Sequence, residues 1–137
     1  MSLTYWRRPE ETGLKMSKRF GGLVKQYRQR LGVTMREFCL KNGFDAGNFS
    51  RLERGMYPPP ESREKLEAYA HALGLTPGSD GWTDFFDVAS VERGAIPEDL
   101  MDDAALVEKL PVFFRTLRTT PVDAESLDKL IDQIRST

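Results

Sequence analysis

Apolar residues in the first half of the chain recur at the spacing of short amphipathic helices. The first predicted helix runs from Phe20 to Leu31, and Gly32 provides its C-terminal cap because glycine tolerates the left-handed conformation found there. No segment alternates convincingly between apolar and polar residues at period two, so strands are not predicted. The pattern favours an all-α fold. The apolar face of the first helix consists of Phe20, Leu23, Val24, Tyr27 and Leu31.

Two closely spaced helices are predicted next. Thr34 and Glu37 form a capping box, which starts a helix over Met35–Asn42. Asp45 caps the following helix, Ala46–Arg54, because its carboxylate can accept a hydrogen bond from a backbone N–H of the first turn. Two short helices joined by a turn of three or four residues form the helix-turn-helix pattern.

The residue sizes in this pattern agree with the packing that two crossing helices require. Cys39 is small enough for the point where the helices cross, and Gly43, in the Gly43-Phe44 turn, tolerates a positive φ angle. Phe49 and Leu52 are predicted to face the core. The outward positions of the second helix are then Ala46, Gly47, Asn48, Ser50 and Arg51.

Two more helices follow this pattern. The prolines at 58–60 force an extended connection, after which Ser62 caps a helix that ends at Gly74. A further helix is predicted from Asp80 to near Gly94. One face of that helix carries Trp82, Phe85, Phe86 and Ala89.

The last third of the chain is also predicted to be helical. A helix with an acidic start at Glu98 is expected to run to Leu117, and Pro111 within it should kink or split it. A final helix follows Pro121. Its apolar stripe consists of Leu127, Leu130, Ile131 and Ile134.

Charge is distributed unevenly along the chain, although the net charge is only −1 over 137 residues. Residues 15–75 hold twelve Lys and Arg against six Asp and Glu, a net of +6, whereas residues 76–137 hold six against thirteen, a net of −7. A basic half joined to an acidic half favours a polyanionic partner for the first half and another role for the second. Two solvated surfaces are the alternative that composition leaves open.

Composition also bounds the function. No apolar run reaches the roughly 18–20 residues of a membrane span, and no signal peptide opens the sequence, so a cytoplasmic protein is expected. The lone Cys39 excludes an internal disulfide and is expected to be a packing residue rather than a redox sensor. The single His71 leaves little material for a catalytic triad or a metal site, so we expect no enzyme activity, cofactor or metal. Four acids are expected to complement a helix dipole rather than to bind metal: Glu98, Asp99, Asp102 and Asp103.

Much of the first half resembles the Xre and lambdoid phage repressor family (Cro/cI type) of helix-turn-helix DNA-binding domains. The resemblance covers Phe20–Leu75 and is carried above all by TMREFCLKNGFDAGNFSRLERGMYPPP (Thr34–Pro60) and LEAYAHALGL (Leu66–Leu75). It implies a compact bundle of four to five helices, the fifth supplied by the stretch Trp82–Ala89, and binding to operator DNA as a dimer.

The resemblance also implies roles for individual residues. Thr34 and Met35 match positions that lie against DNA phosphates, where N–H groups at a helix start can bind an anion. Arg28 and Glu53 match a structural ion pair that joins the first helix to the recognition helix. The other expected DNA contacts are Arg36, Lys41, Ala46, Gly47, Asn48, Ser50 and Arg51.

Two of these positions depart from the family pattern. Ala46 and Gly47 stand where related repressors often carry long polar side chains. Either the backbone approaches the DNA closely there, or base reading rests on Asn48 and Arg51 alone. Arg51 is the best candidate for a base contact, because a bidentate donor suits guanine.

Three regions are predicted: an N-terminal arm (1–14), a helix-turn-helix domain (15–76) and an acidic helical extension (77–137) for packing, dimerisation or partner binding. The stretch IPEDLMDDAALVEKLPVFFRTLR (Ile96–Arg118) resembles extensions of small bacterial and mobile-element regulators. The expected function is a sequence-specific, homodimeric transcriptional regulator that acts as a repressor on double-stranded DNA. The alternative is an antitoxin whose acidic half neutralises a toxin while the motif represses its own operon.

The apolar stripe of the final helix also has two interpretations. It either pairs with a second copy of the chain, or packs onto Phe113, Phe114 and Leu117 of the same chain.

Overall fold

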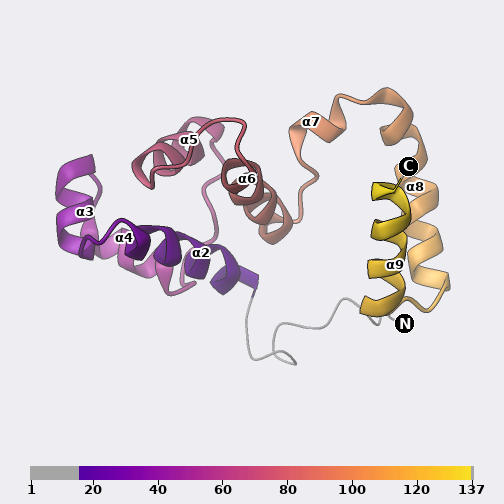
Figure 1. The fold of residues 1–137 in the computed structure, drawn as a ribbon, viewed down its shortest axis with the longest axis horizontal. Helices are drawn as coiled ribbons and strands as arrows, with labels where there is room; N and C mark the ends of the chain where they lie inside the picture. The colour runs from indigo at the N-terminus through magenta and orange to yellow at the C-terminus, as the bar shows by residue number, and fades with distance from the viewer. Residues whose placement is uncertain (1–15, 137) are drawn as a thin grey trace. The chain divides into compact units, whose positions relative to one another are not determined.

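The computed structural model describes residues 16–136, so the predicted arm over residues 1–14 lies outside the described residues. Eight α-helices and no strand occur in this part of the chain, which confirms the all-α prediction (Figure 1). The chain divides into two compact units, which we call the N-terminal unit, ending at Pro97, and the C-terminal unit, beginning at Glu98. No helix among the described residues is long and apolar enough to cross a membrane.

The N-terminal unit contains five helices. The first of them packs against both the third and the fifth (Figure 1). In chain order they are α2 (Met16–Arg30), α3 (Met35–Asn42), α4 (Ala46–Glu53), α5 (Arg63–Ala72) and α6 (Asp80–Arg93).

The helix starts have the hydrogen bonds that their sequences indicate. Thr34 Oγ1 accepts the Glu37 N–H at 3.1 Å and Glu37 Oε1 accepts the Thr34 N–H at 3.0 Å, which confirms the capping box. The hydrogen bond from the Thr34 backbone lowers the pKa of the Glu37 carboxyl. Asp45 and Ser62 cap α4 and α5, each by accepting one backbone N–H of the first turn with its side chain, so these two predictions are also confirmed.

An aromatic cluster holds α3, α4 and α5 together. Phe49 of α4 packs on Phe38 of α3 with ring centroids 5.1 Å apart. It also stacks on Phe44, at 5.6 Å, and meets Tyr69 of α5 edge-on at 5.3 Å. Because Phe49 is buried by three other rings, the inner face of α4 is fixed in the core, as predicted.

Helix α6 belongs to the same core, although its sequence lies in the acidic half. Phe85 packs on Phe20 of α2 with ring centroids 5.0 Å apart, and both rings are fully buried. The N-terminal unit therefore extends past residue 76. Leu31 was expected on the inner face of the first helix, but it is 44% exposed because α2 ends at Arg30.

The C-terminal unit contains α7 (Glu98–Met101), α8 (Ala104–Thr119) and α9 (Ala124–Arg135). Of the two effects expected of Pro111, a kink or a split, the split does not occur, because Pro111 lies inside α8. The helical stretch is interrupted at Asp102-Asp103 instead. Asp103 caps α8 by accepting the Leu106 N–H at 3.1 Å. Pro111 removes one backbone donor from an exposed helix, where solvent can bind the carbonyl group that loses its partner.

Candidate nucleic-acid interface

The turn between α3 and α4 depends on a glycine. Gly43 has a φ of 72°, in the left-handed region, and its N–H bonds to the carbonyl of Cys39 at the end of α3. Asp45 then accepts the Asn48 N–H at 2.8 Å and starts α4. Cys39 is buried, which confirms its predicted packing role.

A buried ion pair joins α2 to the end of α4. Arg28 donates from Nε to Glu53 Oε2 at 2.7 Å, from Nη2 to Glu53 Oε1 at 3.0 Å, and from Nη1 to the Val33 carbonyl at 3.1 Å. Both members of the pair are 8% exposed. The hydrogen bond with Glu53 raises the pKa of the Arg28 guanidinium, although burial acts in the opposite direction. The ion pair implied by the family resemblance is thus confirmed, and it ties the C-terminal end of α4 to α2.

Gly21 is a second point of attachment between α2 and α4, and the sequence patterns did not predict it. A Cβ at this position would lie 2.4 Å from the Leu52 carbonyl oxygen and 2.6 Å from that of Glu53. At the neighbouring Gly22 a Cβ would meet nothing within 4 Å. The signal available in the sequence is a glycine pair inside an amphipathic helix, where glycine is unfavourable unless packing requires it.

The residues expected to contact DNA lie on α3, on α4 and at the cap of α3. Ser50 and Met35 are half-buried. The Met35 side chain packs against the core and lies next to the Cys39 thiol, at 3.7 Å between the two sulfur atoms. Only its backbone is therefore available to a phosphate. The remaining members of the set are exposed: Thr34, Arg36, Lys41, Ala46, Gly47, Asn48 and Arg51.

Comparison with known protein families assigns the same stretch of chain. Residues 19–80 match the family described as a helix-turn-helix domain. This segment is a helix-turn-helix domain. The resemblance to the Xre and Cro-type group is confirmed, and α3 and α4 are the two helices of the motif, with α4 as the recognition helix.

Among solved structures, the chain is similar to the clp gene regulator ClgR from C. glutamicum. The two are 29% identical, and the match covers 56% of this chain and 90% of that chain with a TM-score of 0.42. A comparison with curated proteins finds no match.

On the exposed face of the helix-turn-helix domain, two of the expected contacts are bonded to each other. Arg51 Nη1 donates to Asn48 Oδ1 at 3.2 Å. A Cβ at Gly47 would lie 3.5 Å from the same arginine nitrogen, so the guanidinium lies close over a residue that has no side chain. Arg54, at the C-cap of α4, has a different partner and donates to the Ser50 carbonyl at 3.4 Å.

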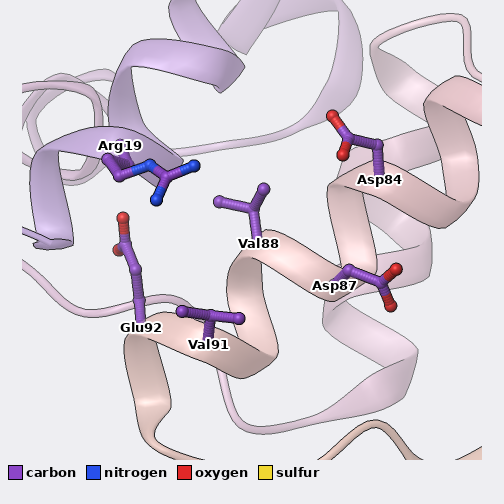
Figure 2. Close-up of a pocket in the computed structure, with 6 residues that line it drawn as sticks. All are labelled: Arg19, Asp84, Asp87, Val88, Val91 and Glu92. Atoms are coloured by element: carbon purple, nitrogen blue, oxygen red, sulfur yellow. The ribbon is translucent and has the colours of Figure 1, made fainter. Parts of the chain in front are cut away.

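A pocket of about 210 Å³ lies between α2 and α6. Figure 2 shows Glu92 of α6 pointing toward Arg19 of α2. Glu92 Oε1 accepts the Phe20 N–H, while Oε2 is buried with no hydrogen-bond partner among the described residues, and burial raises the pKa of this carboxyl to about 7. None of the expected DNA contacts lines the pocket, and the described residues contain no cluster that could hold a metal. The other lining residues are Asp84, Asp87, Val88 and Val91.

Proposed function

We propose that this chain is a sequence-specific DNA-binding transcriptional regulator that acts as a repressor by occupying an operator. The observation that carries the proposal is the helix-turn-helix domain of residues 19–80. Its recognition helix is held to the core by Phe49 and by the Arg28–Glu53 pair, while the opposite face is exposed. In this class of domain the second helix enters the major groove and the first crosses the DNA backbone.

The two helices of the motif would make different DNA contacts: α3 would bind phosphates and α4 would bind base edges. Backbone N–H groups at the start of α3, together with the exposed Arg36 and Lys41 side chains, suit phosphates and would set the position on the duplex. Asn48 and Arg51 of α4 suit base edges. The small Ala46 and Gly47, with Ser50 beside them, would let the start of α4 approach the groove.

Replacing Arg51 with Ala should weaken binding to an operator selected from random DNA by about 1–3 kcal/mol, roughly 5- to 150-fold, and should relax the preference at one base pair of each half-site. Arg36→Ala should weaken binding to all sequences alike, because a phosphate contact carries no sequence information. Fluorescence anisotropy with the operator and with a scrambled duplex measures both effects. If both substitutions lowered operator binding and scrambled-duplex binding by one common factor, Arg51 would not be a base-reading residue.

We also propose that two copies of the chain bind together, joined through the C-terminal unit. A single recognition helix contacts too few base pairs for tight binding, and a dimer would occupy half-sites about 34 Å apart. None of the described residues of the C-terminal unit is buried. So small a unit lacks a core of its own and gains one by association. Its exposed apolar side chains include Val112, Phe113, Phe114, Leu130, Ile131 and Ile134.

The charges beside this apolar surface favour a second copy as the partner. Helix α9 carries both signs next to its apolar stripe, so two identical helices can pair across a two-fold axis without a large excess of either charge. These residues are Asp128, Lys129, Asp132 and Arg135.

Replacing Leu130 and Ile134 together with Asp should convert the dimer to a monomer while helicity is kept, as followed by analytical ultracentrifugation and circular dichroism. The control is Lys109→Asp, which changes the net charge by the same −2 at an exposed side chain of α8 that lies outside the stripe and its flanking charges. An unchanged dimer in the double variant would rule out this stripe as the dimer contact. General unfolding would show that the stripe packs within its own chain.

The acidic second half also supports the antitoxin alternative, in which a basic toxin covers the same apolar surface. A wild-type chain that is monomeric, yet releases the cell from the toxicity of a co-expressed neighbouring gene product, would favour this function. Toxicity that persists in the presence of the chain would exclude it.

A further inference from the structure

The side chains of Asn48 and Arg51 form a hydrogen-bonded pair on the exposed face of the recognition helix. The Asn48 backbone N–H is bound to Asp45 at 2.8 Å, and the Asn48 side-chain Oδ1 accepts from Arg51 Nη1 at 3.2 Å. The two residues are one helical turn apart, and both are exposed. A ligand approaching this face therefore meets the two side chains as one group.

The chemistry of arginine fixes which way the Asn48 amide points. A guanidinium has five N–H donors and no acceptor, so only the carbonyl oxygen of Asn48 can face it. The Nδ2 hydrogens of Asn48 have no protein acceptor among the described residues and are left for a ligand. Arg51 likewise keeps its other N–H donors. The pair presents several hydrogen-bond donors, and the amide oxygen of Asn48 is turned toward Arg51.

Gly47 lies beside this pair. A Cβ at residue 47 would lie 3.5 Å from Arg51 Nη1 and 3.3 Å from Asp45 Oδ1, with no third atom within 4 Å. A Cβ at 3.5 Å would be in ordinary van der Waals contact with the guanidinium, so a small side chain at residue 47 is compatible with the pair.

We propose that Asn48 and Arg51 act as one reading unit, rich in hydrogen-bond donors, that selects guanine in each half-site. This inference rests on the proposed function, because it assumes that α4 enters the major groove. Guanine presents two acceptors there, N7 and O6, which match two donors. Adenine presents one acceptor and one donor, so bidentate reading by asparagine would require its carbonyl oxygen to turn from Arg51 toward the base.

The inference is tested by selecting sequences from a random duplex pool with the full chain and then measuring affinities for single-base variants of the selected site. We expect guanine at one fixed position of each half-site, and an affinity about tenfold or more lower when that guanine is replaced with adenine. Replacing it with 7-deazaguanine, which lacks the N7 acceptor, should also weaken binding. Adenine at this position, or affinity unchanged by the 7-deaza base, would overturn the proposal.

Variants test whether the two residues act together. Asn48→Ala should lower the guanine-over-adenine preference several-fold although the charge is unchanged, and the double variant with Arg51→Ala should lose less than the product of the two single losses. Arg54→Ala is the matched control: it removes an exposed arginine of the same helix end and should lower affinity for all sequences while the guanine preference stays. Independent, multiplicative losses, or a preference that survives Asn48→Ala, would contradict the proposal.

Failure of this inference and failure of the proposed function give different results. If the chain binds random duplexes with strong salt dependence but shows no guanine preference, the reading unit is wrong and the DNA-binding function stands. If the chain binds no duplex at any salt concentration, the proposed function fails and the inference fails with it. Circular dichroism checks that each variant keeps its helicity. A loss of affinity can then be assigned to the exposed side chains and not to unfolding.

Discussion

Replacing Glu53 with Ala is expected to lower the free energy of unfolding of the N-terminal unit by about 3–5 kcal/mol. The carboxylate accepts two hydrogen bonds from Arg28, and both residues are 8% exposed, so removal of one partner leaves an unpaired charge in the core. Alanine is the better helix former, so intrinsic propensity cannot account for a loss of stability. Urea unfolding followed by circular dichroism measures the change.

The exposed pair Arg63–Glu67 provides the matched control. Its two charged atoms lie 3.2 Å apart on the surface of α5, four residues apart in the sequence. Because solvent screens such pairs, Glu67→Ala should cost less than about 1 kcal/mol. Equal effects of Glu53→Ala and Glu67→Ala would show that the Arg28–Glu53 pair does not hold the recognition helix.

Gly21→Ala should destabilise the same unit by about 1–3 kcal/mol or more, because the added Cβ cannot be accommodated by a side-chain rotation. The atoms it would meet are backbone atoms of α4, the nearest at 2.4 Å, so α2 and α4 must move apart. The recognition helix would shift with them, and operator binding should fall as well. Thermal unfolding and anisotropy measure the two consequences.

Gly22→Ala is the control for this experiment and should have the opposite sign. A Cβ at residue 22 has open space around it, so the substitution should stabilise the helix by up to about 1 kcal/mol. If Gly21→Ala and Gly22→Ala changed stability in the same direction, the close approach of α2 to α4 at Gly21 would be wrong.

Features that depend on a few neighbouring residues were predictable from the sequence. The capping box at Thr34 and Glu37 and the cap at Asp45 involve residues three apart, so the sequence alone indicates the hydrogen bonds that form. Helical periodicity likewise placed Phe49 inside. The Arg28–Glu53 pair joins residues 25 apart in the sequence, and only the family resemblance predicted it.

Features that depend on the distance between helices, or on competition between two local signals, were not predictable. The contact of Gly21 with α4 depends on how closely α2 and α4 approach each other, and the helical periodicity of neither segment indicates that distance. At the start of α8, the cap at Asp103 decided where the helix begins, whereas Pro111 was tolerated within it. The extent of the N-terminal unit depended on Phe85 reaching Phe20, a contact between residues 65 apart.

The sequence predicted which residues of the candidate interface face outward, but not how their side chains contact one another. Periodicity placed Asn48 and Arg51 outward, and both are exposed. Their mutual hydrogen bond depends on side-chain rotamers, so no residue spacing could establish it. At Met35 the prediction concerned the backbone N–H groups that would bind phosphate; the inward packing of its side chain beside Cys39 is an added finding that residue spacing did not indicate.

The measurement that tests the central claim most directly is the affinity of the full chain for a random-sequence duplex between about 50 and 200 mM salt. Each phosphate that the protein neutralises releases condensed cations, so the logarithm of the affinity should fall linearly with the logarithm of the salt concentration, by about 0.9 per phosphate. For six or more neutralised phosphates in a dimer, the affinity should fall about a thousandfold or more over this range. Arg36→Ala should make the slope shallower by about 1 for each phosphate that the arginine no longer neutralises. An affinity that stays constant across this range, or no binding at the lowest salt concentration, would contradict the account.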